Sequence, residues 1–349
     1  MTIKRVLAAS AVIAMAAVGL ARGQEAEPLD VAPVDMAVVG PIDLRPKFVE
    51  GETVGYDVIL KTLQARKILL LGDEDIQTAR LERRIWVRVL EKLDDGGARV
   101  ELTHGRIRLE VKPPNWEVAW IYDSAAPNPS QRFTPQQQML DRIREAKYIV
   151  RLNEFGRAVE VENTAHIEQA IGDHPAQISL GKLFDDEWAK SACDDIWCVS
   201  PDAPAREIGD AWSTEAVNEA DGIQGAKTVF VHRLVEATPE TARIEGVGEL
   251  KVNAGDQLKL ENVPAHLAEQ SAEFEQEWDR EMGMLASLDT LQMLDLRLDD
   301  RHAGFDYYIR LLTHLIYSRA ELAEDAAGGE DGMQVGKAED GAAEGNDGG

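Results

Sequence analysis

Residues 80–112 read RLERRIWVRVLEKLDDGGARVELTHGRIRLEVK, and this stretch decides the fold. Apolar side chains alternate with polar ones from Arg80 to Leu90 and again from Ala98 to Lys112, which is the period of a β-strand. The sequence DDGG, Asp94 to Gly97, lies between the two runs and predicts a hairpin turn. The apolar phase changes near Gly105, as it does at a β-bulge. We therefore predict an antiparallel hairpin with one bulge.

The side chains of this hairpin indicate which face meets solvent. Ile85, Val87 and Val89 share one face of the first strand. Five arginines are distributed over both strands: Arg83, Arg84, Arg88, Arg106 and Arg108. We expect one wet face that carries the arginines and one dry face that packs into a core.

Further strand pairs are predicted along the chain. They are Tyr148–Leu152 with Arg157–Val161, Lys227–Val235 with Thr241–Val252, and Leu291–Leu298 with Phe305–Leu312. Because these strands follow one another through short turns, the sheet should be antiparallel and not doubly wound.

An internal repeat divides the chain into two halves. Two segments share the spacing of a proline, a glycine, an acid and an apolar residue: Pro46, Gly51, Glu52 and Val54 in the first, and Pro204, Gly209, Asp210 and Trp212 in the second. Each segment precedes a pair of predicted strands. We interpret this internal repeat, which we call the internal echo, as evidence of a duplication.

One helix is predicted in each half. In the first, Thr134 and Gln137 form a capping box with Pro135 at the first helical position. In the second, a helix should begin at Pro264, because apolar residues recur at helical spacing: Leu267, Phe274, Trp278, Met282 and Leu285. The expected fold class is α+β, with two related antiparallel β-sheet halves, each with a covering helix, that together can form one continuous curved sheet.

The beginning of the chain predicts export. Lys4 and Arg5 precede an apolar run, Val6 to Leu20, and small residues Ala21 and Gly23 predict cleavage after Gly23. The run is shorter than a membrane span needs. The expected segments are a signal peptide (1–23), a linker (24–43), a first β-rich half (44–165), a helical connector with a cysteine loop (166–203), a second β-rich half (204–319) and a disordered acidic tail (320–349). We expect a periplasmic or extracellular protein with no transmembrane segment after signal removal.

Charge and cysteines limit the possible partners. The formal net charge is −26, which excludes nucleic acid and anionic lipid surfaces as partners.

Cys193 and Cys198 are the only cysteines, and an oxidising compartment favours a disulfide between them. A zinc site is the alternative, but the nearest histidine, His174, lies well upstream without a second cysteine pair.

The sequence lacks the common catalytic and nucleotide-binding signatures, such as GxSxG, HExxH and GxGxxG. We therefore predict no catalytic, cofactor-binding or metal-binding residue and no cofactor.

Three sets of residues could have a functional role, and each also has a structural explanation. His266, Glu269 and Glu273 could form a metal-binding helix face but are better explained as solvated residues, and Asp73, Glu74 and Asp75 could form an acid pair but predict an exposed loop. Trp86, Trp116, Trp120, Trp188, Trp197 and Trp212 could line a ligand cleft, although core positions are commoner.

The segments Phe48–Tyr56 and Ile208–Trp212 and the turn Asn153–Gly156 resemble an uncharacterised family of exported bacterial proteins, a domain of unknown function. The resemblance implies a duplicated antiparallel-sheet domain, loosely similar in shape to lipoprotein-carrier folds that wrap acyl chains in a curved sheet. It implies no functional residues.

Three function classes follow. The first is a non-enzymatic envelope protein that binds an apolar or amphipathic ligand, or a partner protein, on its sheet. The second is an extracytoplasmic hydrolase with a scattered carboxylate or metal site, and the third is a structural interaction module. We favour the first, because alternating strands with a helix over one face are typical of a sheet that binds on that face.

Overall fold

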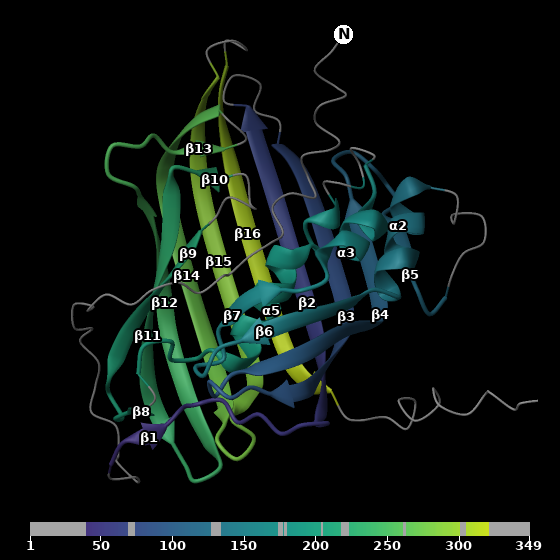
Figure 1. Ribbon diagram of the computed structural model, residues 1–349. Coiled ribbons are helices and arrows are strands. Elements are labelled where there is room, and N and C mark those ends of the chain that lie inside the picture. Colours follow the sequence, from purple (N-terminus) through teal and green to yellow (C-terminus); the bar gives the residue numbers. More distant parts are fainter. Residues whose placement is uncertain are drawn as a thin grey trace, which may run out of the picture.

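The computed structural model describes residues 40–68, 74–126, 134–173, 177, 180–203, 205–217, 223–260, 263–300 and 305–320. These residues form mostly antiparallel β-sheet with three helices, which confirms the α+β class. One sheet has 14 strands, and its main path runs in the order β7-β6-β4-β3-β2-β16-β15-β14-β12-β11-β9 (Figure 1). The two predicted halves are therefore parts of one continuous sheet.

The first half begins with long strands. It contains β2 (Thr53–Ile68), β3 (Glu74–Lys92), β4 (Ala98–Lys112), β5 (Trp120–Asp123), β6 (Lys147–Leu152) and β7 (Ala158–Val161). The predicted hairpin is β3 with β4, and the Leu93 amide donates to the Gly97 carbonyl at 2.9 Å across its turn. The predicted bulge is also present, since Arg83 pairs with Ile107 and Ile85 with His104.

The second half consists of strands only, within the part of it that the structure describes. They are β8 (Ala205–Arg206), β9 (Ala211–Val217), β10 (Ile223–Gln224), β11 (Ala226–Ala237), β12 (Thr241–Val252), β13 (Lys259–Leu260), β14 (Val263–Asp279), β15 (Met284–Asp300) and β16 (Phe305–Ala320). The halves join where β16 pairs antiparallel with β2, from Tyr307 opposite Ile68 to Ala320 opposite Gly55.

The helix predicted from Pro264 is wrong, because this segment is strand β14. Buried and exposed residues alternate strictly from Ser271 to Trp278, with Phe274 and Trp278 buried and Glu275 exposed. Glutamates favour helices intrinsically, but pairing with β12 and β15 on both sides decides the conformation here. The second half therefore has no covering helix among its described residues.

The two segments of the internal echo attach to the sheet in the same way. The Gly51 amide donates to the Val89 carbonyl at 2.8 Å, and Val89 donates back to Glu52 at 3.0 Å. In the second half Gly209 donates to Leu234 at 2.8 Å, and Leu234 donates back to Asp210 at 3.1 Å. Both glycines have a positive φ, 81° and 96°, which explains why glycine stands there. Just before them, β1 (Ile42–Asp43) pairs with β8.

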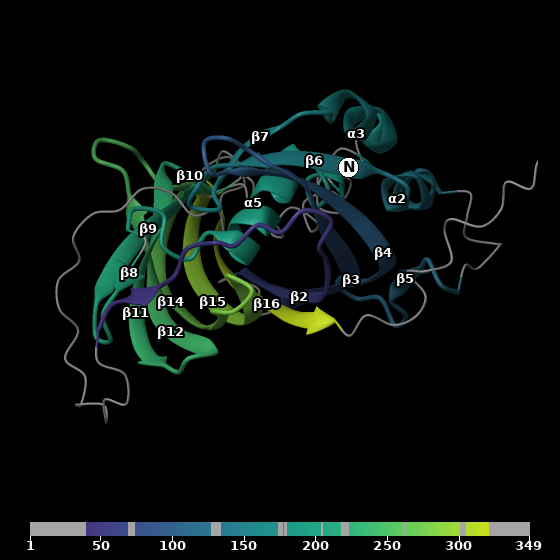
Figure 2. The same cartoon turned by 60° about the horizontal axis from the view of Figure 1, so that its bottom comes forward.

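Three helices lie on one face of the sheet: α2 (Pro135–Arg144), α3 (Thr164–Ile171) and α5 (Asp186–Trp197). The predicted N-cap of α2 is present, with the Thr134 side chain accepting from the Gln137 amide at 3.3 Å, but the reciprocal bond of a capping box is not formed, because Oε1 of Gln137 has no partner among the described residues. Helix α5 packs against β6, β7 and β15, and strands from both halves lie around it in Figure 2. We call the face that contacts α5 the inner face and the opposite one the outer face.

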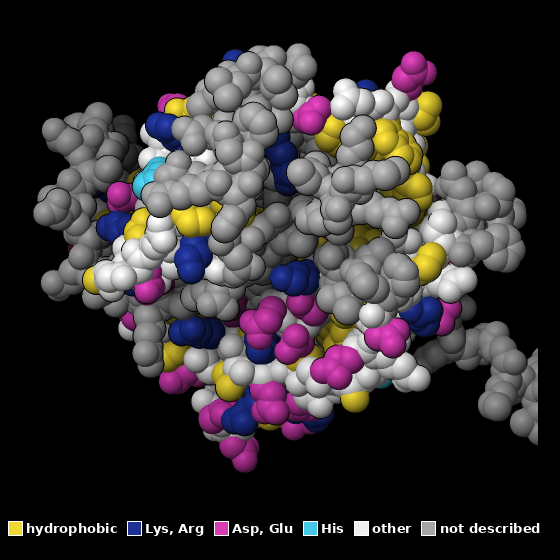
Figure 3. All heavy atoms as spheres, turned by 90° about the horizontal axis from the view of Figure 1, so that it is seen from above, with side chains coloured by type: hydrophobic (Ala, Val, Ile, Leu, Met, Phe, Trp, Pro, Cys, Tyr) yellow, Lys and Arg dark blue, Asp and Glu magenta, His cyan; other side chains and the backbone are white. Residues whose placement is uncertain are grey.

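The outer face is charged. Arg84 pairs with Asp57 at 2.8 Å and Arg310 with Asp295 at 2.6 Å. Seen from above in Figure 3, toward the ends of the strands, the described surface also has acidic side chains interspersed with Lys and Arg. One predicted wet-face arginine is misplaced, however, because Arg83 is buried on the inner face.

The ends of the chain lie outside the described residues. The predicted signal peptide, most of the linker and the acidic tail therefore remain sequence-based expectations.

Candidate ligand site beneath helix α5

Helix α5 is unusually buried for its length. Asp185 caps its N-terminus by accepting from the Trp188 amide at 2.9 Å, and Asp186 and Glu187 complement the helix dipole in the first turn. Nine of its twelve residues are buried. A helix buried on nearly every side must be surrounded by other elements, and here the sheet supplies them.

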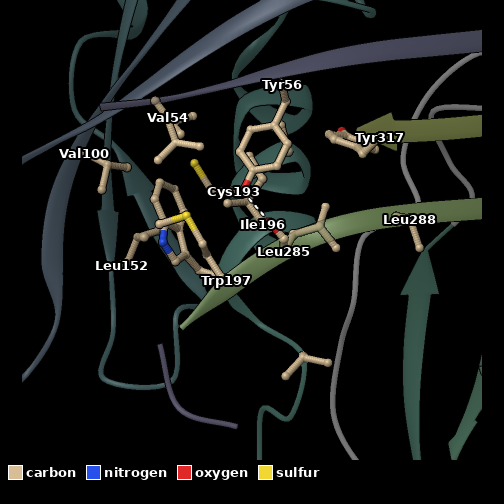
Figure 4. Close-up of a cluster of buried hydrophobic side chains, with 14 of the residues drawn as sticks. Val54, Tyr56, Val100, Leu152, Cys193, Ile196, Trp197, Leu285, Leu288 and Tyr317 are labelled. Carbon is tan, nitrogen blue, oxygen red and sulfur yellow. Dashed lines mark hydrogen bonds between the residues drawn. The ribbon is translucent and has the colours of Figure 1, made fainter. Parts of the chain in front are cut away.

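The apolar contacts of α5 reach both halves of the sheet. Figure 4 shows Ile196 and Trp197 of α5 among Val54, Leu152 and Leu285, which belong to β2, β6 and β15. The Tyr56 hydroxyl donates to the Leu285 carbonyl at 2.7 Å across this cluster. The helix therefore occupies a space bounded by apolar side chains from strands far apart in the sequence.

Polar side chains interrupt this contact on the sheet side. The ring of His104 stacks on the indole of Trp188, with centroids 4.9 Å apart, and the Arg83 guanidinium lies 4.0 Å from the same indole. Arg83 also donates to the Leu183 carbonyl at 2.8 Å. Burial lowers the pKa of Arg83 to about 10, and burial together with Arg83 holds the pKa of His104 well below its usual value. His104 is thus neutral at neutral pH.

Several buried polar atoms at this contact have no hydrogen-bond partner among the described residues. They are Nδ1 and Nε2 of His104, Nε of Arg83, and the indole nitrogens of Trp188 and Trp197. Leaving a buried polar group unpaired costs about 1–3 kcal/mol. The contact between α5 and the sheet is therefore weaker than an apolar contact of the same size.

Two consecutive carboxyl groups of α5 are buried as well. Asp194 accepts from the Ala158 amide at 2.6 Å, and Asp195 is hydrogen-bonded to Tyr317. Burial raises the pKa of Asp194 to about 7 and raises that of Asp195 well above its usual range. Both carboxyl groups thus favour the protonated form more than exposed aspartates do.

A small cavity lies between α5 and the second half. Its lining includes Asp195, His232, Gln276 and Thr290 as polar residues, with Phe230, Phe274 and Leu288 as apolar ones. Nε2 of His232 lies 2.7 Å from the Thr214 hydroxyl, while Nδ1 has no partner among the described residues. The volume is about 30 Å³, enough for water but far below the roughly 300 Å³ of a small-molecule pocket. The site is closed while α5 is in place.

The cysteines lie at the end of α5, not in the loop that the sequence suggested. Cys193 is inside the helix and Cys198 is its C-cap, and both are buried free thiols. Positions five apart on a helix are rotated by about 140° from each other. The predicted disulfide stays a prediction, and its formation requires the last turn of α5 to change.

The metal candidate of the sequence does not assemble. His266, Glu269 and Glu273 are exposed residues of the extended strand β14, and at about 3.3 Å per residue the first and last lie about 23 Å apart. No group of three or more His, Cys, Asp or Glu among the described residues is placed to hold a metal ion. Glu74 and Asp75 are exposed as predicted, but the loop predicted for them is wrong, because they begin strand β3; Asp73 lies outside the described residues.

Of the tryptophans weighed as cleft residues, Trp188, Trp197 and Trp212 are buried and Trp116 is exposed. His314 lies on the outer face, 2.8 Å from Asp289. Sequence reasoning missed Arg83, His104 and Asp195 as site residues. The alternation of apolar residues could have shown that Arg83 and His104 face the core. Arg83 lies on the same face of its strand as Ile85, and His104 on the same face as Leu102.

Comparisons with known proteins give little further information. No protein-family model matches the chain, and no curated protein matches its sequence. Among solved structures, lipovitellin, described for its lipid-protein interactions, is 11% identical with a TM-score of 0.40 over 79% of this chain. The chain spans 26% of the length of lipovitellin.

Two further solved structures are similar. DynF from the dynemicin biosynthesis pathway of Micromonospora chersina is 8% identical, with a TM-score of 0.18 over 86% of this chain and 95% of its own. A DUF1329 family protein from Desulfovibrio piger is 8% identical, with a TM-score of 0.14 over 77% of this chain and 88% of its own. None of the three reaches a TM-score of 0.5, so none bears on function.

None of the described helices has the length and apolar character needed to cross a membrane.

Proposed function

We propose that this protein binds an apolar or amphipathic ligand on the inner face of its sheet, in the space that α5 fills. The observation that carries the proposal is the set of unpaired polar atoms at the contact between α5 and the sheet, on His104, Arg83, Trp188 and Trp197. A helix held by such a contact can leave its place at lower cost than one held by a fully apolar core.

The inner face has the right chemistry once α5 is absent. Val54, Val87, Val100 and Leu288, on four strands from both halves, belong to the apolar cluster that α5 now covers. Their burial in contact with an acyl chain would replace their burial against α5, at about 25 cal/mol per Å² of apolar surface. The ligand and α5 therefore compete for one surface.

The competition predicts how affinity depends on the docking of α5. If only a small fraction of molecules has α5 displaced, the apparent dissociation constant is the intrinsic one divided by that fraction. A change that strengthens the docking of α5 should then weaken ligand binding, although it stabilises the fold. A change elsewhere in the core should alter stability alone.

The test is a fluorescence titration of the mature chain with cis-parinaric acid, a polyene fatty acid. His104→Leu removes two unpaired ring nitrogens beneath Trp188, so its free energy of unfolding should rise by about 1–2 kcal/mol. The probe should bind this variant about 5- to 30-fold more weakly than the unmodified chain. Ile143→Val, in the separate cluster beneath α2, is the control and should lose stability with unchanged probe affinity.

Two results would contradict the proposal. One is the absence of saturable probe binding by the unmodified chain. The other is a stabilised His104→Leu variant that binds the probe as tightly as the unmodified chain does.

The setting of this function belongs to the same proposal. We infer that the chain acts in the cell envelope after removal of residues 1–23, and that its sheet is curved around the ligand. We also propose that the two halves arose by duplication, which the matching attachments of Gly51 and Gly209 support.

A further inference from the structure

The outer face of the second half carries a groove that the proposed function does not use. It crosses β11, β12, β14, β15 and β16 as two adjoining cavities of about 530 and 470 Å³, whose walls share Glu275 and Asp289. Ligand pockets usually measure roughly 300–1,000 Å³. Each of these cavities is therefore large enough to hold a ligand, unlike the cavity beneath α5.

Three carboxylates lie side by side across the floor of this groove. Glu245 of β12 is directly opposite Glu275 of β14, which is directly opposite Asp289 of β15. Like charges at directly opposite positions of neighbouring strands repel each other. The fold therefore accepts an unfavourable row of charges at this place.

The surrounding residues offset this repulsion only in part. Arg243 lies 3.5 Å from Glu245 and 3.7 Å from Glu275, and His314 lies 2.8 Å from Asp289. The residues lining the two cavities include six carboxylates and two arginines: Glu236, Glu245, Glu273, Glu275, Glu277, Asp289, Arg233 and Arg243. The excess of negative charge favours a cationic occupant.

Apolar side chains lie beside the carboxylate row. Val247 and Leu291 are 41% and 44% exposed, and both are opposite Glu273 in the register of the sheet. They are two residues along their strands from Glu245 and Asp289, a separation of about 7 Å. An occupant that carries a positive charge and an apolar group at this spacing would contact both rows.

We propose that this groove binds a basic amphipathic segment of a partner protein. The carboxylate row from Glu245 to Asp289 covers two spacings between strands, about 10 Å, which matches three residues of an extended segment. Lys or Arg side chains of the segment pair with the carboxylates, while a neighbouring apolar side chain rests on Val247 and Leu291. The net charge of −26 also attracts a basic partner from a distance.

The test uses fluorescence anisotropy of short labelled peptides with the full mature chain. A peptide of Lys and Leu should bind, whereas peptides of the same length with Ser in place of Leu, or Glu in place of Lys, should bind at least about tenfold more weakly. Glu275→Gln should lower the affinity about 5- to 10-fold while the midpoint of thermal unfolding stays equal or rises, because it removes two like-charge contacts. Leu291→Ser should also lower the affinity.

Glu249→Gln is the matched control, because Glu249 is an acidic residue of β12 that does not line the groove. It should bind the peptide as the unmodified chain does. An equal loss with Glu249→Gln and Glu275→Gln would overturn the proposal, since it would reveal attraction to overall charge alone. Unchanged affinity of Glu275→Gln, or equal binding of the Ser-containing peptide, would also overturn it. Glu275→Gln should bind cis-parinaric acid as tightly as the unmodified chain does. The proposal for this groove and the proposal for the inner face can therefore be rejected separately.

Discussion

The imidazole of His104 lies stacked on the indole of Trp188 with their centroids 4.9 Å apart, and neither ring nitrogen of His104 has a hydrogen-bond partner among the described residues. His104 belongs to the sheet and Trp188 to α5, so under the proposed function this pair forms part of the boundary that opens when a ligand enters. Edge contacts from Tyr148 and Phe184 enclose the same imidazole. Packing of this boundary is dense, but its polar atoms are poorly satisfied.

Trp197→Ala should destabilise the protein and strengthen binding of an apolar ligand. Trp197 is 1% exposed, and its removal from the core should cost about 3–5 kcal/mol of unfolding free energy. Because the loss falls on the docking of α5, the displaced state becomes more populated and cis-parinaric acid should bind more tightly. Chemical denaturation and probe titration measure the two effects. A destabilised variant with weaker probe binding would argue against competition between α5 and the ligand.

Asp194→Asn should stabilise the protein at alkaline pH and have little effect at acidic pH. The pKa of Asp194 is about 7 in the folded protein and near 3.8 when unfolded, so the folded state binds more protons between these values. Stability therefore falls as pH rises through this window, and the penalty is complete above pH 7. The asparagine carbonyl can still accept from Ala158. The variant should be more stable by about 4 kcal/mol at pH 8 and nearly equal at pH 4; equal stability at pH 8 would contradict the burial of this carboxylate.

The buried histidine His232 should have the opposite effect on the pH dependence of stability. Burial lowers the pKa of His232 to about 3, so the unfolded state binds more protons between that value and 6.5. Stability from this group is present above pH 6.5 and is lost as pH falls. His232→Asn should flatten the acid side of the stability profile, as measured by thermal unfolding from pH 4 to pH 7. An unchanged acid limb would mean that His232 does not titrate in this way.

The hairpins were accessible from sequence because their signals are local. The alternation in residues 80–112 and the DDGG turn predict β4 and most of β3 without reference to the rest of the chain, although β3 begins earlier, at Glu74. The cap of α2 was also local, since Thr134 and Gln137 are three residues apart.

Strand β14 and the candidate site could not be predicted from the sequence, because they depend on residues that are distant in the chain. The residues Phe274, Trp278, Met282 and Leu285 satisfy a helical spacing, and only pairing with β12 and β15 selects the strand. His104 and Trp188 are far apart in sequence and meet only after the sheet and α5 have packed. The outer groove likewise needs the register of three strands to align Glu245, Glu275 and Asp289.

Gly246→Ala should destabilise the second half. A Cβ atom at this position would lie 2.3 Å from the ring of Phe274 and 2.3 Å from the Val231 carbonyl oxygen, so Phe274 or the backbone would have to shift. Such overpacking costs about 1–3 kcal/mol. The midpoint of thermal unfolding should fall accordingly, and an unchanged midpoint would show that the inner face at Phe274 is looser than described.

The cysteines offer a test of export. If the chain matures in an oxidising compartment, protein unfolded without reductant should show no alkylation of Cys193 or Cys198 in its intact mass. Two alkylated thiols on protein recovered from the envelope would contradict the predicted disulfide. In reduced, folded protein, burial raises the pKa of both thiols, so alkylation should be slow.

The most direct test of the central claim is hydrogen exchange of the α5 amides in the full chain, with and without a saturating fatty acid. If the ligand takes the place of α5, amides from Trp188 to Trp197 should exchange faster with ligand bound, while those of β2, β3 and β15 exchange at the same rate or more slowly. Unchanged or greater protection of α5 at saturating ligand would contradict the account.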